Sequence, residues 1–213
     1  MNVSGTTLAD YRAQVCSAVV ETVALKNATP VEATLQALPP VPACAVVRDL
    51  IPEVLSPFVW LERDLPEACV TLLRRAAANV TSSRIGVDVA ASHLFARLNI
   101  PFEYSEEAIE VPPIEPWLPF CEWARTAAAL ATPRVPLPRE LSTDRTRVAL
   151  ERGITFFILA ERYTDAALLL RWHGALFIEE AVFRTRAASH LLTVSRSSET
   201  HMHVRFAVEV LAT

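Results

Sequence analysis

Side chains that bind metals or act in catalysis occur along this 213-residue chain, but none stands at a spacing that defines a site. The five histidines include no H-E-x-x-H motif, and the four widely separated cysteines include no C-x-x-C pair. No G-x-S-x-G motif is present, and four glycines are too few to suggest a phosphate-binding loop. The sequence therefore predicts a protein that is not an enzyme and that holds neither a metal nor a cofactor.

Arginine supplies almost all of the positive charge. Lys26 is the only lysine, and the other nineteen basic side chains are arginines. The formal net charge of −4 argues against a broad basic face for nucleic acid, but it allows local arginine patches. A planar guanidinium suits contacts with phosphate, so arginines are the candidates for binding RNA. These candidates are Arg74, Arg75, Arg171, Arg184 and Arg186.

The composition is apolar, with 52% hydrophobic and 21% charged residues. Large apolar surfaces are usually covered, so this composition predicts contact with partner subunits; a well-filled core is the alternative. No run of about 18 apolar residues is present, which predicts that the chain does not insert into a membrane. The first residues contain neither a basic region nor an apolar one, so no secretory signal is expected.

The first half of the chain has the apolar spacing and the start signals of helices. A capping box is predicted at 7–10, and other helix starts are expected at 29–30, 64 and 83. Pro52 and Pro57 are predicted to cut the surrounding apolar stretch into short pieces, because proline breaks helices.

The second half is predicted to contain a small sheet. Residues 99–113 have an extended pattern, whereas 115–131 have a helical one. The apolar run 147–160 predicts one strand, or two strands hinged at Gly153. Residues 202–210 alternate between apolar and polar, which predicts a half-buried strand, with His203 facing solvent, in a C-terminal β-hairpin. The predicted fold class is therefore α+β: a helical region at 1–81, and an α/β region at 82–213 with a small mixed sheet.

Three stretches carry a family resemblance. The matching residues are Ser82, Ser83, Leu94, Leu98, Ile100 and Glu107; Val148, Ala149, Leu150, Glu151, Gly153 and Phe156; and Thr164, Leu168, Leu169 and Arg171. On these residues, segment 82–185 resembles a RAP domain, a small α/β module akin to the PD-(D/E)XK nuclease fold and found in mitochondrial RNA-handling proteins. Arg152 stands where that family has Asp, and Ile154 where it has Pro, so the resemblance is to a degenerate RAP domain.

The resemblance implies that Glu122, Glu151 and Gly153 are the remnant of a nuclease-like site. Such a site needs two acidic groups to hold a metal and usually a lysine to activate water. Lys26 lies in the helical half, so the resemblance implies that this chemistry has been lost. The alternative is structural: Gly153 permits a bulge at a strand edge or hinge, and the charges of Glu151 and Arg152 reach solvent.

Together these features predict a non-enzymatic structural subunit of a large macromolecular assembly. The RAP resemblance favours a mitochondrial ribonucleoprotein, such as the mitochondrial ribosome or its assembly intermediate, in which arginines contact RNA. The alternative is a protein-only assembly, such as a capsid or a peripheral subunit of a membrane complex, in which the arginines pair with carboxylates. The predicted compartment is accordingly the mitochondrion, or otherwise another intracellular location.

Overall fold

In the computed structural model, the described residues are 7–79, 85–101, 109–132 and 135–210, and they form ten α-helices without a strand. The helices are α1 (Leu8–Leu25), α2 (Thr29–Ala37), α3 (Pro40–Leu61), α4 (Glu67–Asn79), α5 (Val87–Arg97), α6 (Trp117–Thr126), α7 (Asp144–Leu159), α8 (Tyr163–Leu176), α9 (Ala181–Val194) and α10 (Ser198–Arg205). A 3₁₀ turn, η1 (Arg139–Leu141), precedes α7, and a π-helical turn, η2 (Phe206–Val210), follows α10. The predicted α+β fold with a small mixed sheet is therefore wrong for the part of the chain that the structure describes.

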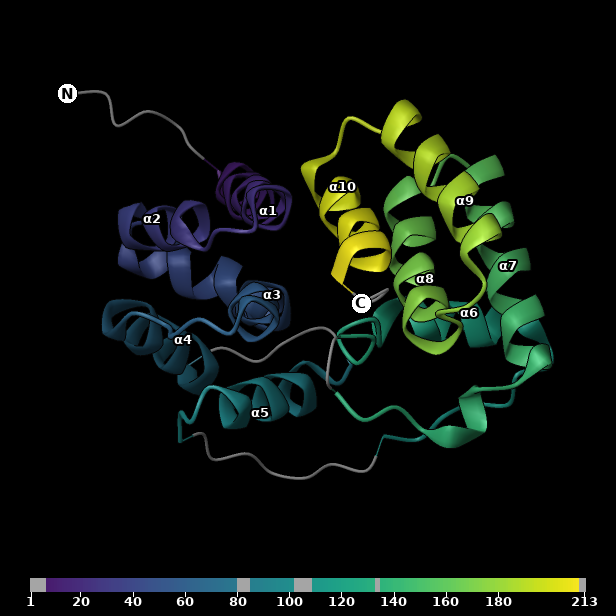
Figure 1. Ribbon diagram of the computed structural model, residues 1–213, viewed down its shortest axis with the longest axis horizontal. Helices are drawn as coiled ribbons and strands as arrows, with labels where there is room; N and C mark the ends of the chain where they lie inside the picture. Colours follow the sequence, from purple (N-terminus) through teal and green to yellow (C-terminus); the bar gives the residue numbers. More distant parts are fainter. Residues whose placement is uncertain (1–6, 80–84, 102–108, 133–134, 211–213) are drawn as a thin grey trace.

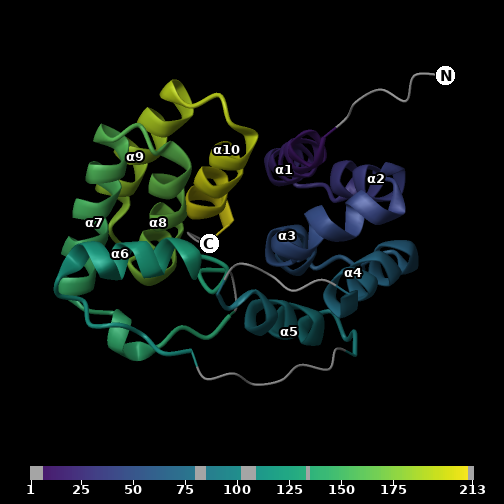
Figure 2. The same cartoon turned by 180° about the vertical axis from the view of Figure 1, so that it is seen from behind.

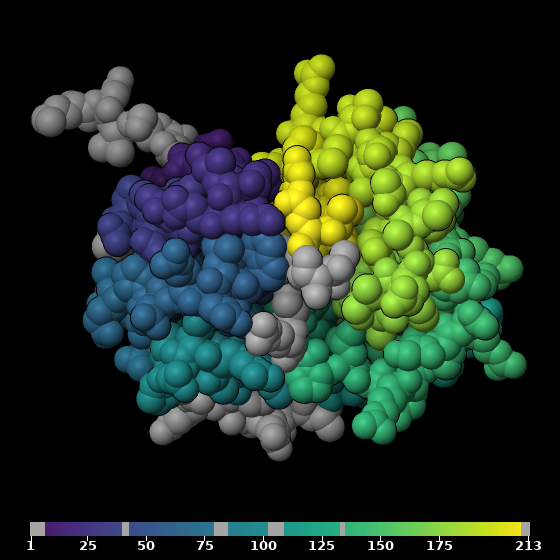
Figure 3. Space-filling view, viewed as in Figure 1, coloured from purple at the N-terminus to yellow at the C-terminus, as the bar shows by residue number. Residues whose placement is uncertain are grey.

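The helices form two groups, α1 to α5 on one side of the molecule and α6 to α9 on the other, with α10 between them (Figure 1). The view from behind shows the same division (Figure 2), and the space-filling view shows α10 in contact with both groups (Figure 3). Each group has its own apolar cluster. The C-terminal segment formed by α10 and η2 joins the two: Met202 and Phe206 belong to the first cluster, whereas Val204 and Ala207 belong to the second.

The start of α1 is fixed by the predicted capping box. The Asp10 backbone N–H donates to the Thr7 hydroxyl at 3.2 Å, and the Thr7 backbone N–H donates to the Asp10 carboxylate at 2.7 Å. These bonds satisfy donors that a first helical turn leaves without a partner. The bonds that the Thr7 backbone N–H and hydroxyl donate to the Asp10 carboxylate lower the pKa of Asp10. The start expected at 29 is the first residue of α2, and the start expected at 64 lies three residues before α4 begins at Glu67. The start expected at 83 lies outside the described residues.

The two prolines of α3 do not break it, contrary to the prediction. Pro52 and Pro57 stand inside a continuous helix of 22 residues, and the Ser56 hydroxyl donates to the Pro52 carbonyl oxygen at 2.6 Å. A proline inside a helix costs about 3 kcal/mol. This helix runs through the first apolar cluster, where Ile51 and Phe58 are fully buried among many others. Since each such side chain contributes about 1.5–3 kcal/mol, packing outweighs the two prolines.

The apolar run 147–160 forms most of α7, so the strand prediction is wrong here. Its inward residues follow helical spacing: Thr146, Ala149, Leu150, Gly153, Ile154 and Phe157. A Cβ at Gly153 would lie 2.5 Å from the Cys121 Sγ and 2.7 Å from the Leu169 Cδ1, so the glycine lets α6 and α8 pack closely against α7. The run resembled a strand because its outward face, with Phe156 and Leu159, is apolar as well.

The predicted C-terminal β-hairpin is also wrong. Residues 189–194 end α9, and residues 202–210 lie in α10 and η2. Apolar residues alternate here because two opposite faces of α10 are buried, one in each apolar cluster. The polar stretch 196–200 is not a hairpin turn but contains the start of α10, where the Thr200 N–H donates to the Ser197 hydroxyl at 3.4 Å.

The predictions for the middle of the chain are met in part. Of the segment 99–113, expected to be extended, residues 102–108 lie outside the described residues, and 109–113 have no regular secondary structure. The helix expected at 115–131 is present but shorter, because α6 ends at Thr126.

In the second group, α6, α7, α8 and α9 surround one core. No described helix covers the outer face of α7.

Candidate functional site

The five arginines predicted to contact RNA do not form one surface. Arg171 is fully buried, and Arg184 donates hydrogen bonds to the carbonyl oxygens of Phe177 and Ile178, both at 3.0 Å. The remaining three are exposed on α4 and α9, which lie on opposite sides of the molecule (Figure 1). They are Arg74, Arg75 and Arg186. Two of the five candidates are thus held inside the protein, and RNA contact by the other three stays a prediction.

Glu122 and Glu151 do not share a site. Glu122 accepts hydrogen bonds from Arg125 and from the Arg162 Nη1, the latter at 3.2 Å, whereas Glu151 accepts one from the Arg147 Nη1 at 3.1 Å. Burial alone would raise the pKa of Glu122, but the two arginines outweigh it and lower that pKa. Within the described ranges, no group of three His, Cys, Asp or Glu side chains could hold a metal ion. The two acids therefore have separate ion-pair roles.

A buried ion network joins the two groups of helices and is called the seam below. Arg171 of α8 donates to Glu53 of α3 at 2.5 Å, and both side chains are fully buried. The same guanidinium lies 3.2 Å from the Nδ1 of His203 in α10. It also donates to the Ala131 carbonyl oxygen and to the Thr132 hydroxyl. The seam thus ties α3, α8 and α10 together.

A second ion pair continues the seam towards the surface. Arg12 of α1 donates to both carboxylate oxygens of Glu199 in α10, at 3.0 and 2.6 Å, and the His203 Nε2 lies 3.8 Å from the same carboxylate. Burial alone would raise the pKa of Glu199, but His203 and Arg12 outweigh it and hold that pKa well below its usual range. The side chains of Arg171, Glu53 and His203 are fully buried, so this part of the seam presents no surface to a ligand.

The outer face of α7 forms the floor of an open groove, called the α7 groove below. It has a volume of about 570 Å³ and is lined by Trp117, Val148, Glu151, Arg152, Thr155, Phe156, Leu159 and Phe183. Trp117 begins α6 and Phe183 lies in the first turn of α9, so three helices contribute to the lining. Phe156 is 41% exposed and Leu159 is 80% exposed. Contiguous apolar surface of this kind marks interaction sites on soluble proteins.

The aromatic walls of the α7 groove are held in place from behind. Trp117 and Phe183 both pack on one side against the second apolar cluster. The rings of Trp117 and Phe156 meet edge to face, with their centroids 5.9 Å apart. A preformed groove loses less conformational entropy when a ligand binds, so more of the contact energy remains as affinity.

The two charged residues of the α7 groove differ in their surroundings. Glu151 pairs with Arg147 and lies 3.5 Å from the Nε2 of His173. Arg152 is exposed and has neither a hydrogen bond nor an ion pair with any described residue. The groove therefore offers one uncompensated guanidinium among apolar side chains.

His173 lies behind the α7 groove and is fully buried. Neither ring nitrogen has a hydrogen-bond partner within the described part of the chain. The centroid of its ring is 5.4 Å from that of Phe183 and 5.7 Å from that of Phe177. Burial lowers the pKa of His173, and the nearby Glu151 carboxylate offsets only part of this effect. Protonation of His173 would therefore place an imidazolium directly behind two groove residues, Glu151 and Phe183.

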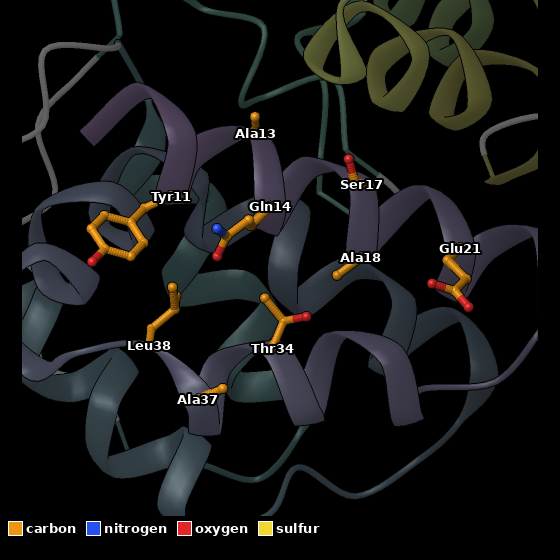
Figure 4. A pocket seen from close by; sticks show the side chains of 9 residues that line it. All are labelled: Tyr11, Ala13, Gln14, Ser17, Ala18, Glu21, Thr34, Ala37 and Leu38. Atoms are coloured by element: carbon orange, nitrogen blue, oxygen red, sulfur yellow. The ribbon is translucent and has the colours of Figure 1, made fainter. Parts of the chain in front are cut away.

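A second hollow, of about 480 Å³, lies between α1 and α2 (Figure 4). It is lined by Tyr11, Ala13, Gln14, Ser17, Ala18, Glu21, Thr34, Ala37 and Leu38. Figure 4 shows Tyr11 at one end and Glu21 at the other, with Gln14, Thr34 and Ala18 among the side chains between them. Binding energy concentrates in aromatic and arginine anchors, and Tyr11 is the only such group in this lining. The α7 groove is therefore the stronger candidate site.

Comparison of the chain with protein-family models, curated proteins and solved structures finds no match. It therefore neither supports nor contradicts the resemblance to RAP domains, the predicted mitochondrial setting or the absence of enzymatic activity. No helix in the described ranges is long and apolar enough to cross a membrane. The geometry of the α7 groove is thus the main guide to function.

The α7 groove itself was missed in the sequence. Applied to the apolar run of α7, helical spacing would have placed Arg152, Phe156 and Leu159 on one face, opposite the buried one. Trp117 and Phe183 carry no such local signal, because only the packing of α6 and α9 brings them beside α7.

Proposed function

We propose that the protein is a non-enzymatic subunit of a protein assembly, and that a partner protein binds in the α7 groove. The observation that carries this proposal is the pair of exposed side chains Phe156 and Leu159, which line the groove together with the aromatic side chains of Trp117 and Phe183. Burying apolar surface contributes roughly 25 cal/mol per Å², so a partner that covers this groove stabilises both itself and the protein.

The arginines favour a protein partner over RNA. Arg171 and Arg184 are engaged with groups of the protein itself. The three exposed candidates are divided between α4 and α9, so the described surface does not gather them into the basic stripe that nucleic-acid binding usually needs. Of the two settings predicted from the sequence, the protein-only assembly therefore has the better support.

The proposal is tested by the native size of the tagged full-length chain in the cells that produce it. The wild-type chain is expected to migrate as a complex clearly larger than its own 23.5 kDa, before and after nuclease treatment. The double variant Phe156→Asp/Leu159→Asp is expected to migrate as the free chain. Leu25→Asp is the matched control, because Leu25 is 60% exposed at the far end of α1, and it should leave the complex intact.

Two outcomes would contradict the proposal. A complex that withstands the double variant would mean that the partner binds elsewhere. A complex that nuclease dissolves would mean that RNA, not protein, holds the subunit. Circular dichroism of the purified double variant should give the wild-type helical signal, so that release from the complex reports lost contact and not unfolding.

A further inference from the structure

We infer that the occupant of the α7 groove is an amphipathic helix of a different protein, about three turns long, which carries a carboxylate opposite Arg152. This inference rests on the proposed function and adds the chemistry of the partner. Three features support it: the length of the groove, the presence of a paired Glu151 beside an unpaired Arg152, and the symmetry that a second copy of this chain would impose.

The length of the groove suits a short helix. Its floor runs along α7 from Val148 to Leu159, which at 1.5 Å per residue is about 17 Å. A helix of about 11 or 12 residues covers that distance, with apolar side chains at i, i+4, i+7 and i+11. The described chain offers no strand edge beside the groove, so a partner cannot bind here by extending a sheet.

The charge of the groove selects an acidic partner. Arg152 stands near the middle of the floor with apolar neighbours on both sides, and it has no ion pair of its own among the described residues. A partner that covers the groove removes water from this guanidinium, and an unpaired buried charge opposes binding strongly. Glu151 cannot compensate in full, because it already pairs with Arg147 at 3.1 Å. A carboxylate on the partner would pair with the covered Arg152 guanidinium and fix the register of the bound helix.

A second copy of this chain fits the groove less well. Two copies that pair through the same face are related by a twofold axis, so each residue near the axis meets its own copy. Arg152 lies near the middle of the floor, and the pairing would bring two guanidinium groups together. Like charges in contact disfavour association, which points to a different protein as the partner.

The test is a display selection on the full-length chain, with a library of 14-residue helices as the probe. Apolar residues are fixed at i, i+4, i+7 and i+11, and the positions between them on the same face vary among Asp, Glu, Asn, Gln, Lys and Arg. The wild-type chain is expected to enrich Asp or Glu at one position, and Arg152→Glu is expected to enrich Lys or Arg at that position. The best acidic peptide should bind Arg152→Gln about tenfold more weakly than it binds the wild-type chain.

The outcomes separate this inference from the proposed function. Helices that require Phe156 and Leu159 but show no charge preference would overturn the inference and leave the proposed function standing. Equal recovery of the library on wild type and on Phe156→Asp/Leu159→Asp would overturn both. If the selection enriches no acidic position, two further results would also overturn the inference, because each would identify a different occupant of the groove. One is sedimentation with vesicles of phosphatidylcholine and phosphatidylserine that is lost in Arg152→Gln; the other is a dimer that is lost in Leu159→Asp.

Discussion

The seam and the α7 groove each contain an arginine, a glutamate and a histidine, but only the arginine of the seam pairs with a carboxylate among the described residues. In the seam, Arg171 is enclosed and bonded to Glu53, and His203 lies 3.2 Å from the same guanidinium. In the groove, Glu151 has a partner, but Arg152 faces solvent alone and His173 lies behind with both ring nitrogens unbonded among the described residues.

The comparison distinguishes a charge that is paired within the fold, Arg171, from a charge that only a ligand could pair, Arg152. A buried charge is tolerated only when its partners are in place, and the enclosed Arg171 of the seam accordingly pairs with Glu53. An exposed charge beside exposed apolar groups is stable in water but becomes costly when covered. The pattern around Arg152 is therefore that of a surface that an outside group completes.

Breaking the seam should have the largest effect on stability. Arg171→Met leaves the Glu53 carboxylate buried without its guanidinium, and breaking a buried ion pair in this way costs about 3–5 kcal/mol. The free energy of unfolding, measured by urea denaturation, should fall by that amount. Removing both charges in Arg171→Met/Glu53→Met should recover much of the loss, because no unpaired charge then remains.

The matched control lies beside the groove. Arg147→Met removes the partner of Glu151, but both side chains of that pair are partly exposed, so the loss in the free energy of unfolding should be much smaller than for Arg171→Met. Equal losses for Arg171→Met and Arg147→Met would contradict the distinction between an enclosed seam and an open groove.

The seam and the groove also differ in how far the sequence could have revealed them. Local signals were sufficient for the start of α1, where Thr7 and Asp10 form the predicted capping box. They failed for α10, because burial on two opposite faces of a helix gives apolar residues at alternate positions, as in a strand. His203 was accordingly expected to face solvent, whereas it is buried in the seam.

Long-range packing explains the remaining failures. Glu53 and Arg171 are 118 residues apart, and no local pattern relates a carboxylate in α3 to a guanidinium in α8. Gly153 was expected to mark a hinge or a bulge, since the sequence does not reveal that Cys121 and Leu169 crowd it. The exposed face of α7 was hidden for a related reason: an apolar outward face and an apolar core face together give a continuous apolar run.

The second prediction concerns pH and the histidine behind the groove. The unfolded chain binds a proton on His173 near its ordinary pKa of 6.5, whereas the folded protein binds it only at lower pH, because burial lowers that pKa. The unfolded state therefore holds more protons below about pH 6.5, and the free energy of unfolding should fall as the pH is lowered from 7 to 5. Denaturation at fixed pH values, compared between wild type and His173→Phe, should give a flatter profile for the variant.

The charged neighbours of His173 also shift its pKa, so changing one of them should alter the pH dependence of stability. Glu151 and Glu180 raise the pKa of His173, and Arg184 lowers it. Glu151→Gln should therefore steepen the loss of stability on the acid side, opposite to the effect of His173→Phe. Glu199 does not affect the comparison of these profiles between pH 7 and 5. Its ordinary pKa is 4.5 and its pKa in the folded protein is lower still, so its stabilising contribution is lost only at lower pH. Identical profiles for wild type and both variants would show that His173 does not titrate behind the groove.

The smallest effect is expected at the exposed face of α7, where the same substitution can be compared at two sites of one helix. Leu150 is fully buried and Leu159 is 80% exposed. Leu150→Ala should lower the free energy of unfolding by about 2–5 kcal/mol, since it opens a cavity in the second apolar cluster. Leu159→Ala should change it by no more than about 0.5 kcal/mol, because the side chain contacts water in the isolated protein. A loss above about 1 kcal/mol for Leu159→Ala would mean that this leucine packs within the chain itself, and the α7 groove would then not be an open face that a partner completes.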